Sequence, residues 1–244
     1  MTVQTKTNKI LLLGGPPHDT YDAHKLGLPH YAFSVFIFNS NGELLMQKRA
    51  GCKYHSGGLW SNTCCSHPLS DDILQIRKYA EERLLFEMGI SSPLEYVFDF
   101  NYKAQCGDLI ENEHDYVFIG YSNAEPQVNP IEVEDYKWID MESIEKDRIE
   151  NPQKYTVWFN FIMNRYYFKI KTFLRKRNSE KSMKMAIKNK LLYIKSIFTP
   201  VLSVYDFSDD FVDKIIVSKE LSNNSLFKKI TKKRKLNIDS HNLL

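Results

Sequence analysis

Short apolar segments separated by turn-forming residues fill the first 140 positions of the chain. Residues 9–13 form a short apolar run, residues 32–39 are rich in aromatic and β-branched side chains, and residues 43–49 bring further apolar positions. The polar triplet Ser40-Asn41-Gly42 between the last two runs is typical of a turn. The pattern therefore predicts one short strand and then a β-hairpin.

A helical spacing of apolar residues begins after residue 72. Asp72 is typical of a helix start and Gly89 of a helix end. The apolar positions between them are Ile73, Ile76, Ala80, Leu84 and Met88. Further strands are predicted at residues 94–102, 111–121 and 132–139, and helices at residues 141–149 and 154–172. Strands interrupted and flanked by helices predict an α/β sandwich with a mixed sheet.

The charge of the chain is unevenly distributed. Residues 169–244 carry 18 lysines and arginines against seven acidic residues, whereas residues 1–168 carry 15 against 23. We therefore expect an acidic domain at residues 1–172 and a basic C-terminal extension at residues 173–244. Apolar periodicity predicts helices at residues 180–198 and 209–221 of the extension, and its polar end is predicted to be disordered.

The sequence also bears on cellular location. No window reaches the roughly 18 apolar residues that a membrane-spanning helix needs, and the first residues lack the pattern of a secretory signal. We therefore expect a cytoplasmic protein without a membrane span. In that reducing compartment the four cysteines are expected to be thiols.

Two pairs of reactive side chains stand at alternate positions of strand-like segments. Cys65 and His67 lie two residues apart in WSNTCCSHP, and Glu111 and Glu113 lie two apart in IENEHDYVF. In an extended chain, residues two apart point to the same side, so each pair shares a face. Two carboxylates held close together either share a proton or bind a cation, because like charges do not both stay ionised unpaired. Thiol, imidazole and paired carboxylates together indicate proton chemistry.

The same motifs carry a family resemblance. Four segments of the chain carry it, in this order: HYAFSVFIFNSNGELLMQKRA, GLWSNTCCSHPL, EERLLFEMGI and IENEHDYVF. The same order is found in the type 1 isopentenyl-diphosphate isomerases, which the chain resembles over residues 9–170. The resemblance implies a Nudix-like α/β/α sandwich. It also implies an isomerase of isoprenoid biosynthesis that interconverts isopentenyl diphosphate and dimethylallyl diphosphate by adding and removing a proton through a tertiary carbocation.

The resemblance implies catalytic roles for four residues. Cys65 would be the catalytic thiol, Glu113 the opposing acid or base, and Tyr102 its hydrogen-bonding partner. We expect nearby positive charge to lower the pKa of the thiol. Trp158 would cover the alkene and stabilise the carbocation, although further aromatic residues beside it make a place in the core the alternative.

The resemblance further implies a metal site of three histidines and two carboxylates. Its residues would be His24, His30, His67, Glu111 and Glu113. His18 also precedes His30, so the sequence leaves open whether His18 or His24 is the first histidine. Mixed nitrogen and oxygen ligands suit Zn²⁺, Mn²⁺ or Mg²⁺, and ligand type alone does not choose among them.

A second set of residues would hold the diphosphate. The family resemblance implies Arg49, Lys53 and Arg83 as its charge partners, and Glu87 as a ligand of a Mg²⁺ ion at the diphosphate. Lys25 would replace a lysine that the family carries before its first histidine. An ion pair within the helix is the alternative for Arg83 and Glu87, which stand four residues apart.

Two other functions compete with the isomerase. A Nudix-type diphosphate hydrolase needs several metal-binding carboxylates on one helix, and residues 81–90 supply too few. A catalytically altered member whose basic tail binds an acidic partner is the other alternative, but both Cys65 and Glu113 are present. We therefore expect an enzyme with a small prenyl diphosphate substrate and divalent metal ions, no nucleic-acid partner, and a monomeric or weakly dimeric state.

Overall fold

The computed structural model describes residues 8–197 of the chain. The chain divides into two compact units, Met1–Ile170 and Lys171–Leu244. The domain boundary predicted after residue 172 lies two residues beyond this division and stays a prediction. Within the described residues, no helix combines the length and the apolar character that crossing a bilayer requires.

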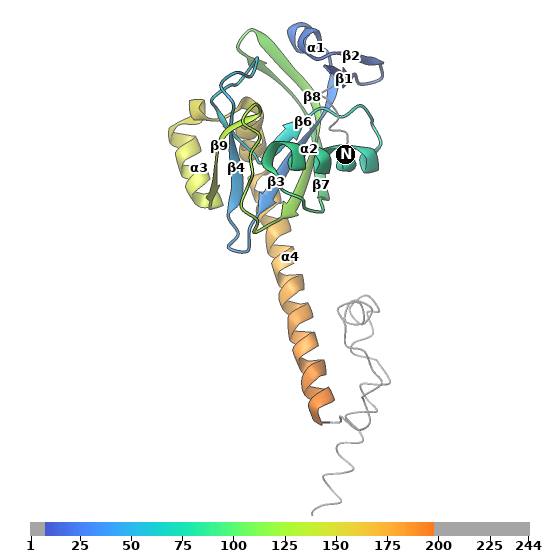
Figure 1. Ribbon diagram of the computed structural model, residues 1–244, viewed down its shortest axis with the longest axis vertical. Helices are drawn as coiled ribbons and strands as arrows, with labels where there is room; N and C mark the ends of the chain where they lie inside the picture. Colours follow the sequence, from blue (N-terminus) through green and yellow to red (C-terminus); the bar gives the residue numbers. More distant parts are fainter. Residues whose placement is uncertain (1–7, 198–244) are drawn as a thin grey trace, which may run out of the picture. The chain divides into compact units, whose positions relative to one another are not determined.

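One mixed β-sheet forms the centre of the first unit (Figure 1). Its central strand β3 is parallel to β8 on one side and antiparallel to β6 and β4, while β7 extends the sheet beyond β8 and β9 pairs with β4. The α/β class with a mixed sheet is thus confirmed. The strands are β3 (His30–Phe38), β4 (Leu44–Arg49), β5 (Trp60–Ser61), β6 (Cys64–Ser66), β7 (Glu95–Cys106), β8 (Leu109–Tyr121) and β9 (Val133–Ile139).

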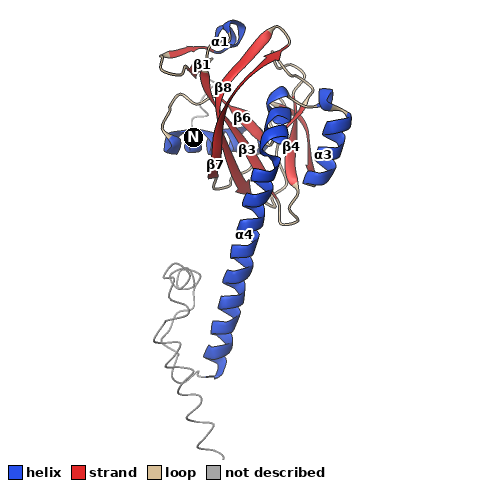
Figure 2. Cartoon of the chain, turned by 180° about the vertical axis from the view of Figure 1, so that it is seen from behind, coloured by secondary structure: helices blue, strands red, loops and turns tan. Residues whose placement is uncertain are grey.

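Helices cover both faces of this sheet. Helix α2 (Ile73–Met88) lies in front of the sheet in Figure 1, and the first turns of α4 (Val157–Ile197) lie on the opposite face, which Figure 2 shows from behind. Alternate residues of β3 explain the arrangement. Val35 belongs to the apolar cluster that includes the buried face of α2, whereas the neighbouring Phe36 stacks on Phe159 of α4.

Helix α2 has the bounds that the sequence predicts. The Asp72 carboxylate accepts hydrogen bonds from the backbone N–H groups of Leu74 and Gln75. At the other end Gly89 has a φ of +67°, which favours glycine, and a Cβ there would lie 2.7 Å from the Gln127 carbonyl oxygen. Helix α2 contains Arg83 and Glu87 and so determines their positions.

A small N-terminal element was not predicted in full. Strands β1 (Lys9–Leu11) and β2 (Pro17–Asp19) pair with each other, and α1 (Thr20–Leu26) follows directly. Asp19 caps the start of α1, and Gly27 ends it with a φ of +62°. Seven residues give too few helical repeats for the spacing to be recognised, so the sequence showed only the first strand.

The end of the chain differs from the expectation. After α3 (Met141–Glu150) and the short 3-10 helix η1 (Pro152–Lys154), the two helices expected at residues 154–172 and 180–198 are one helix, α4. The expected break was wrong because residues 173–179 contain neither proline nor glycine to end a helix. The helix expected at residues 209–221 and the polar end predicted to be disordered lie outside the described residues.

Candidate active site

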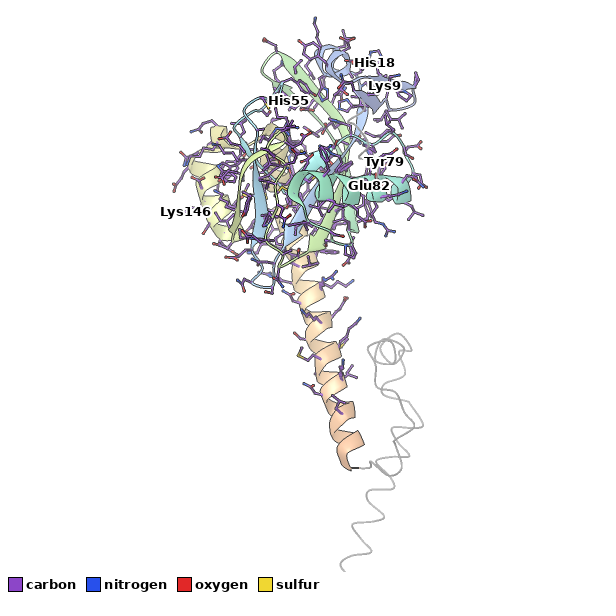
Figure 3. All side chains as sticks on the ribbon, viewed as in Figure 1. Lys9, His18, His55, Tyr79, Glu82 and Lys146 are labelled. Carbon is purple, nitrogen blue, oxygen red and sulfur yellow. The ribbon has the colours of Figure 1, made fainter. Side chains whose placement is uncertain are left out.

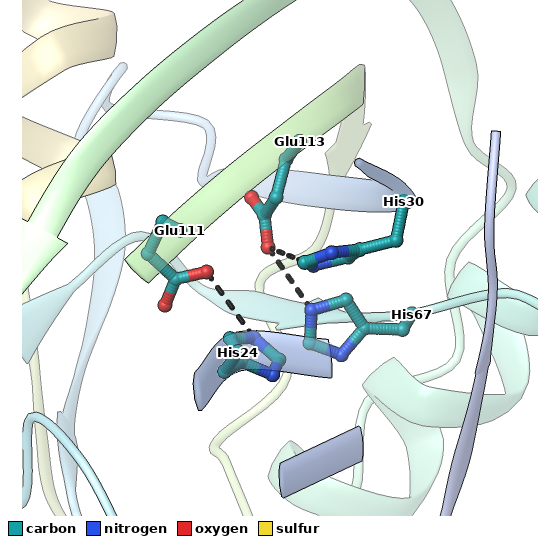
Figure 4. Close-up of side chains that lie close together, drawn as sticks. All are labelled: His24, His30, His67, Glu111 and Glu113. Atoms are coloured by element: carbon teal, nitrogen blue, oxygen red, sulfur yellow. Dashed lines mark hydrogen bonds and ion pairs between the residues drawn. The ribbon is translucent and has the colours of Figure 1, made fainter. Parts of the chain in front are cut away.

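Five side chains from four parts of the chain converge beside β8 (Figure 4). Parallel pairing sets His30, the first residue of β3, opposite Glu113 of β8, and period-two alternation puts Glu111 on the same face. His24 comes from α1 and His67 follows β6. One ligand atom from each residue of this His/Glu cluster lies within 4.8 Å of all the others: His24, His30, His67, Glu111 and Glu113.

Ion-pair contacts join the cluster across the strands. His67 Nε2 lies 3.0 Å and His30 Nε2 3.4 Å from Glu113 Oε1, while His24 Nε2 lies 3.3 Å from Glu111 Oε2. The other ring nitrogens of two histidines face the backbone, His24 Nδ1 at 2.6 Å from the Thr20 carbonyl oxygen and His30 Nδ1 at 2.8 Å from that of Leu28. When Nδ1 donates its proton to a carbonyl, Nε2 keeps its lone pair for the cluster.

The carboxylates of the cluster have different electrostatic surroundings. Burial opposes the ionisation of Glu113, but the close contacts of its Oε1 atom with His30 and His67 hold its pKa well below the usual range. Burial and the charge of Glu113 raise the pKa of Glu111 to about 7. Burial lowers the pKa of His67 to about 4, so this imidazole is neutral at pH 7. Glu113 is therefore ionised at pH 7, whereas Glu111 can take up a proton near that pH.

The cluster has the chemistry of a divalent-metal site. The Nε2 atoms of His24 and His30 and Glu111 Oε2 are buried and make no hydrogen bond. Buried polar atoms without a partner are costly, and a cation would accept all three lone pairs. The structure brings His24 into the cluster, whereas His18 lies on the β1–β2 hairpin (Figure 3) and is not part of it.

Cys65 and Glu113 line one cavity of about 570 Å³, a volume that includes the solvent at its mouth. Cys65 lies on β6, which pairs with one edge of β3, and Glu113 lies on β8, which pairs with the other edge. Thiol and carboxylate therefore reach the cavity from opposite sides of β3. Two groups that enter one cavity from different strands could act on a substrate bound between them.

The expected pKa of the thiol is wrong. Burial raises the pKa of Cys65 to about 12, against the opposing effect of Arg49, whose Nη1 lies 3.9 Å from the sulfur. The nearby positive charge was predictable from the sequence, but the loss of hydration of the thiol, which has the larger effect on its pKa, was not. Cys65 is therefore a neutral thiol that carries a proton. Its neighbour Cys64 is fully buried in the apolar core.

Tyr102 and Trp158 support the site in different ways, because Trp158 lines the cavity and Tyr102 contacts Glu113 from outside the lining. The Tyr102 hydroxyl donates a 2.7 Å hydrogen bond to Glu113 Oε2. Trp158 lines the cavity, and its indole Nε1 donates to Ser61 Oγ at 2.9 Å and to Asn62 Oδ1 at 3.2 Å. The two hydrogen bonds fix the orientation of the indole ring, and the Arg49 guanidinium lies over its face at 5.0 Å from the ring centre.

The cationic residues lie in the same cavity. The lining of the cavity includes Arg49, Lys53, Arg83 and Glu87. Arg83 pairs with Glu87 on α2 and lies 3.4 Å from Glu132, which also pairs with Lys53. Two buried carboxylates thus hold the lysine and one of the arginines in place. Lys25 is different, because it is an exposed residue of α1 outside the cavity lining.

Sequence reasoning missed several residues of the site. His55 lines the cavity, and so does Asp115, which accepts a 2.8 Å hydrogen bond from Ser34 Oγ. Burial raises the pKa of Asp115 well above its usual range. Asp115 continues the alternation of Glu111 and Glu113, a signal that was available in the sequence. His55 and Glu132 stand in irregular segments that carry no such signal.

Comparisons with known proteins agree with this geometry. The NUDIX domain model matches residues 28–159. A protein of Serratia proteamaculans named isopentenyl-diphosphate Delta-isomerase is 45% identical over 141 residues, which cover 57% of this chain and 78% of that protein. A protein of Aromatoleum aromaticum named isopentenyl-diphosphate Delta-isomerase 1 is 46% identical over 59% of this chain and 80% of its own length. The chain therefore belongs to the isopentenyl-diphosphate Delta-isomerase family, which is built on the NUDIX domain.

Proposed function

We propose that this protein interconverts isopentenyl diphosphate and dimethylallyl diphosphate. The observation that carries the proposal is the placement of the Cys65 thiol and the Glu113 carboxylate in one cavity, on strands that flank β3 from opposite sides. Family membership makes this reaction the expected one, and the cavity contains both a proton-bearing group and a proton acceptor.

The reaction moves one double bond with no net change in atoms or charge. A proton adds to the terminal CH₂ carbon of the alkene and leaves a tertiary carbocation. Loss of a proton from the neighbouring CH₂ group then forms the new double bond. The neutral Cys65 thiol carries the proton that the alkene takes up, and the ionised Glu113 accepts the proton that the cation loses. In the reverse direction the two groups exchange roles.

Trp158 stabilises the cation between these two steps. The face of an indole ring attracts a cation by about 2 kcal/mol or more when water is excluded. Trp158 is only 4% exposed, and its hydrogen bonds to Ser61 and Asn62 keep the ring from turning away. The Tyr102 hydroxyl holds Glu113 in a fixed orientation for the proton transfer.

The diphosphate binds at the cationic end of the cavity. Guanidinium groups of Arg49 and Arg83 match phosphate oxygens geometrically, and Lys53 adds a third positive charge. A Mg²⁺ ion on the diphosphate would meet the Glu87 carboxylate there. Lys25 lies outside the cavity lining, so the structure does not support its contact with the diphosphate and that contact stays a prediction.

A divalent metal ion would be held by the His/Glu cluster, which consists of His24, His30, His67, Glu111 and Glu113. Such an ion neutralises the paired carboxylates and tunes the acidity of the groups around it when it is bound. The donor set of three imidazoles and two carboxylates fits Zn²⁺, Mn²⁺ and Mg²⁺, and metal analysis of the purified protein would identify the ion.

Incubation of the protein with isopentenyl diphosphate in deuterated water tests the proposal. We expect dimethylallyl diphosphate with deuterium in its methyl group, because the added proton comes from a group that exchanges with solvent. The Cys65→Ala variant should lose turnover and keep its fold and metal content. The matched control is Cys52→Ala, which removes an exposed cysteine and should leave turnover unchanged. Release of orthophosphate or pyrophosphate without isomerisation would indicate the hydrolase instead.

A further inference from the structure

A second group of metal-ligating side chains adjoins the His/Glu cluster and takes no part in the proposed reaction. Cys106 is the last residue of β7, and period-two alternation puts its side chain on the face that also carries Tyr102. Its Sγ lies 3.8 Å from His55 Nδ1 and 3.0 Å from Ser56 Oγ. His55 Nδ1 in turn lies 3.7 Å from Glu111 Oε1.

Glu111 lies between the two groups and divides its oxygens between them. Oε2 faces His24 Nε2 at 3.3 Å, whereas Oε1 faces His55 Nδ1 at 3.7 Å. A carboxylate with one oxygen toward each of two ligand groups is placed to bridge two metal ions. Both residues that meet at this contact are enclosed, because the side chains of His55 and Glu111 are 8% and 2% exposed.

The separations fit a tetrahedral zinc site. Zinc bonds of about 2.3 Å to sulfur and about 2.0 Å to nitrogen or oxygen, set at tetrahedral angles, put neighbouring ligand atoms roughly 3.3–3.6 Å apart. The observed 3.8 Å from sulfur to nitrogen and 3.7 Å from nitrogen to oxygen exceed this range only slightly. The three ligand atoms all lie within 4.8 Å of one another. The two contacts of His55 Nδ1 would shorten by a few tenths of an ångström when an ion binds.

We propose that Cys106, His55 and Glu111 form a second metal site, which takes a thiophilic divalent cation of the zinc class. Glu111 bridges this ion to the one held by the His/Glu cluster. A thiolate ligand selects zinc over Mg²⁺ and Mn²⁺, which prefer oxygen ligands. On binding, the sulfur forms a bond to the metal, and the thiol proton passes to solvent.

Occupation of this site inhibits isomerisation, a consequence that rests on the proposed function. His55 lines the cavity, and its ring lies 5.9 Å from the ring of Trp158. A further positive charge next to Trp158 disfavours a carbocation at the same place, because like charges repel. The site thus makes the enzyme sensitive to excess zinc. Metal binding by itself does not depend on which reaction the protein catalyses.

Zinc titration of the full-length, metal-stripped protein against a chromophoric chelator tests the site. We expect two zinc ions per wild-type chain and one per chain of Cys106→Ser. The matched control Cys52→Ser, which changes an exposed cysteine that is not part of this ligand group, should keep two. Loading with Co²⁺ adds a spectroscopic readout, because only a thiolate ligand gives a sulfur-to-cobalt charge-transfer band. That band should be present in the wild type and in Cys52→Ser and absent from Cys106→Ser.

Equal stoichiometry in wild type and Cys106→Ser, or a charge-transfer band that survives in Cys106→Ser, would overturn the site. A measurement on the wild type alone guards against misfolding of the variant. Zinc should slow alkylation of Cys106 by iodoacetamide, followed by mass spectrometry of the peptide, and equal rates with and without zinc would also overturn it. Cys106 lies outside the cavity lining, so Cys106→Ser should isomerise normally when supplied with Mg²⁺ or Mn²⁺.

The inhibitory consequence has its own test. Excess zinc should inhibit the wild type, and Cys106→Ser should need at least about tenfold more zinc for the same inhibition, since loss of a metal contact weakens affinity by that order. Equal inhibition of both proteins by zinc would contradict an inhibitory role for the site at Cys106. A protein that binds two zinc ions but does not isomerise would instead contradict the proposed function and leave the site standing.

Discussion

A hydrogen bond to Glu113, the proposed proton acceptor, is the clearest contribution of a single residue to this site. Tyr102 donates to Glu113 Oε2 at 2.7 Å, and Glu113 also contacts His30 and His67 through its other oxygen. The carboxylate is thus held from both sides. Residues that orient a reactive carboxylate in this way commonly matter nearly as much as the carboxylate itself.

We predict that Tyr102→Phe lowers kcat by about 10- to 100-fold, the usual effect of removing such a partner. KM should change little, because Tyr102 is not among the residues of the cationic end. Steady-state kinetics of isomerisation gives both constants. Tyr96→Phe is the matched control, since the Tyr96 hydroxyl bonds to the exposed Asp99 on the same strand. An equal loss of kcat in both variants would contradict the assigned role.

The residues of the site were predictable where they follow a regular spacing. Alternation alone grouped Cys65 with His67 and Glu111 with Glu113, and the structure places all four around one cavity. The protonation of Cys65 was not predictable, because its pKa depends on burial that no local spacing reveals. His55 was overlooked for a related reason: the irregular loop that carries it gives no face from which to infer its direction.

Among the secondary-structure elements, helix α2 shows how strongly local sequence can define a boundary. Asp72 satisfies two N–H groups of the first turn, which have no partner within the helix. We predict that Asp72→Ala reduces the free energy of unfolding by about 0.5–2 kcal/mol, the usual cost of losing such a cap. Chemical denaturation measures the change.

The neighbouring Asp71 provides the control for this prediction. Asp71 is also exposed and acidic but does not cap the helix, so Asp71→Ala should leave the free energy of unfolding nearly unchanged. Equal destabilisation by both substitutions would show that charge near the helix start matters rather than the hydrogen bonds of the cap. Arg83 and Glu87 lie toward the other end of α2. Loosening of the first turn should therefore leave KM nearly unchanged, even though the free energy of unfolding falls.

The arrangement of the elements was harder to predict than the elements themselves. Apolar patterns located β3, α2, β7, β8 and β9 within a few residues, but a strand pattern does not say which strands pair. The parallel pairing of β3 with β8, which sets His30 beside Glu113, joins segments about 80 residues apart in the chain. Helix α1 was missed because of its shortness, although it carries His24.

For the whole molecule, the question is which part of the chain the activity requires. The NUDIX match spans residues 28–159, and the relatives named above align with 57–59% of the chain. Among the described side chains of α4, Ile170 is the last buried hydrophobic one. From Lys171 to Asn189 no described side chain is buried. The residues that build the cavity therefore all belong to the first unit, Met1–Ile170.

We predict that a chain ending after residue 172 isomerises isopentenyl diphosphate with the kcat, KM and metal content of the full chain. It keeps Phe159, Ile162 and Ile170, which anchor α4 in the core, and every residue that lines the cavity. A chain ending after residue 156 is the matched counterpart, because it loses these anchors together with Trp158 and should not fold. Circular dichroism and steady-state kinetics on both chains make the comparison. A folded chain of 172 residues with a raised KM would show that the basic extension helps to bind the anionic substrate, since its positive charge attracts anions at a distance and this effect weakens as salt is added.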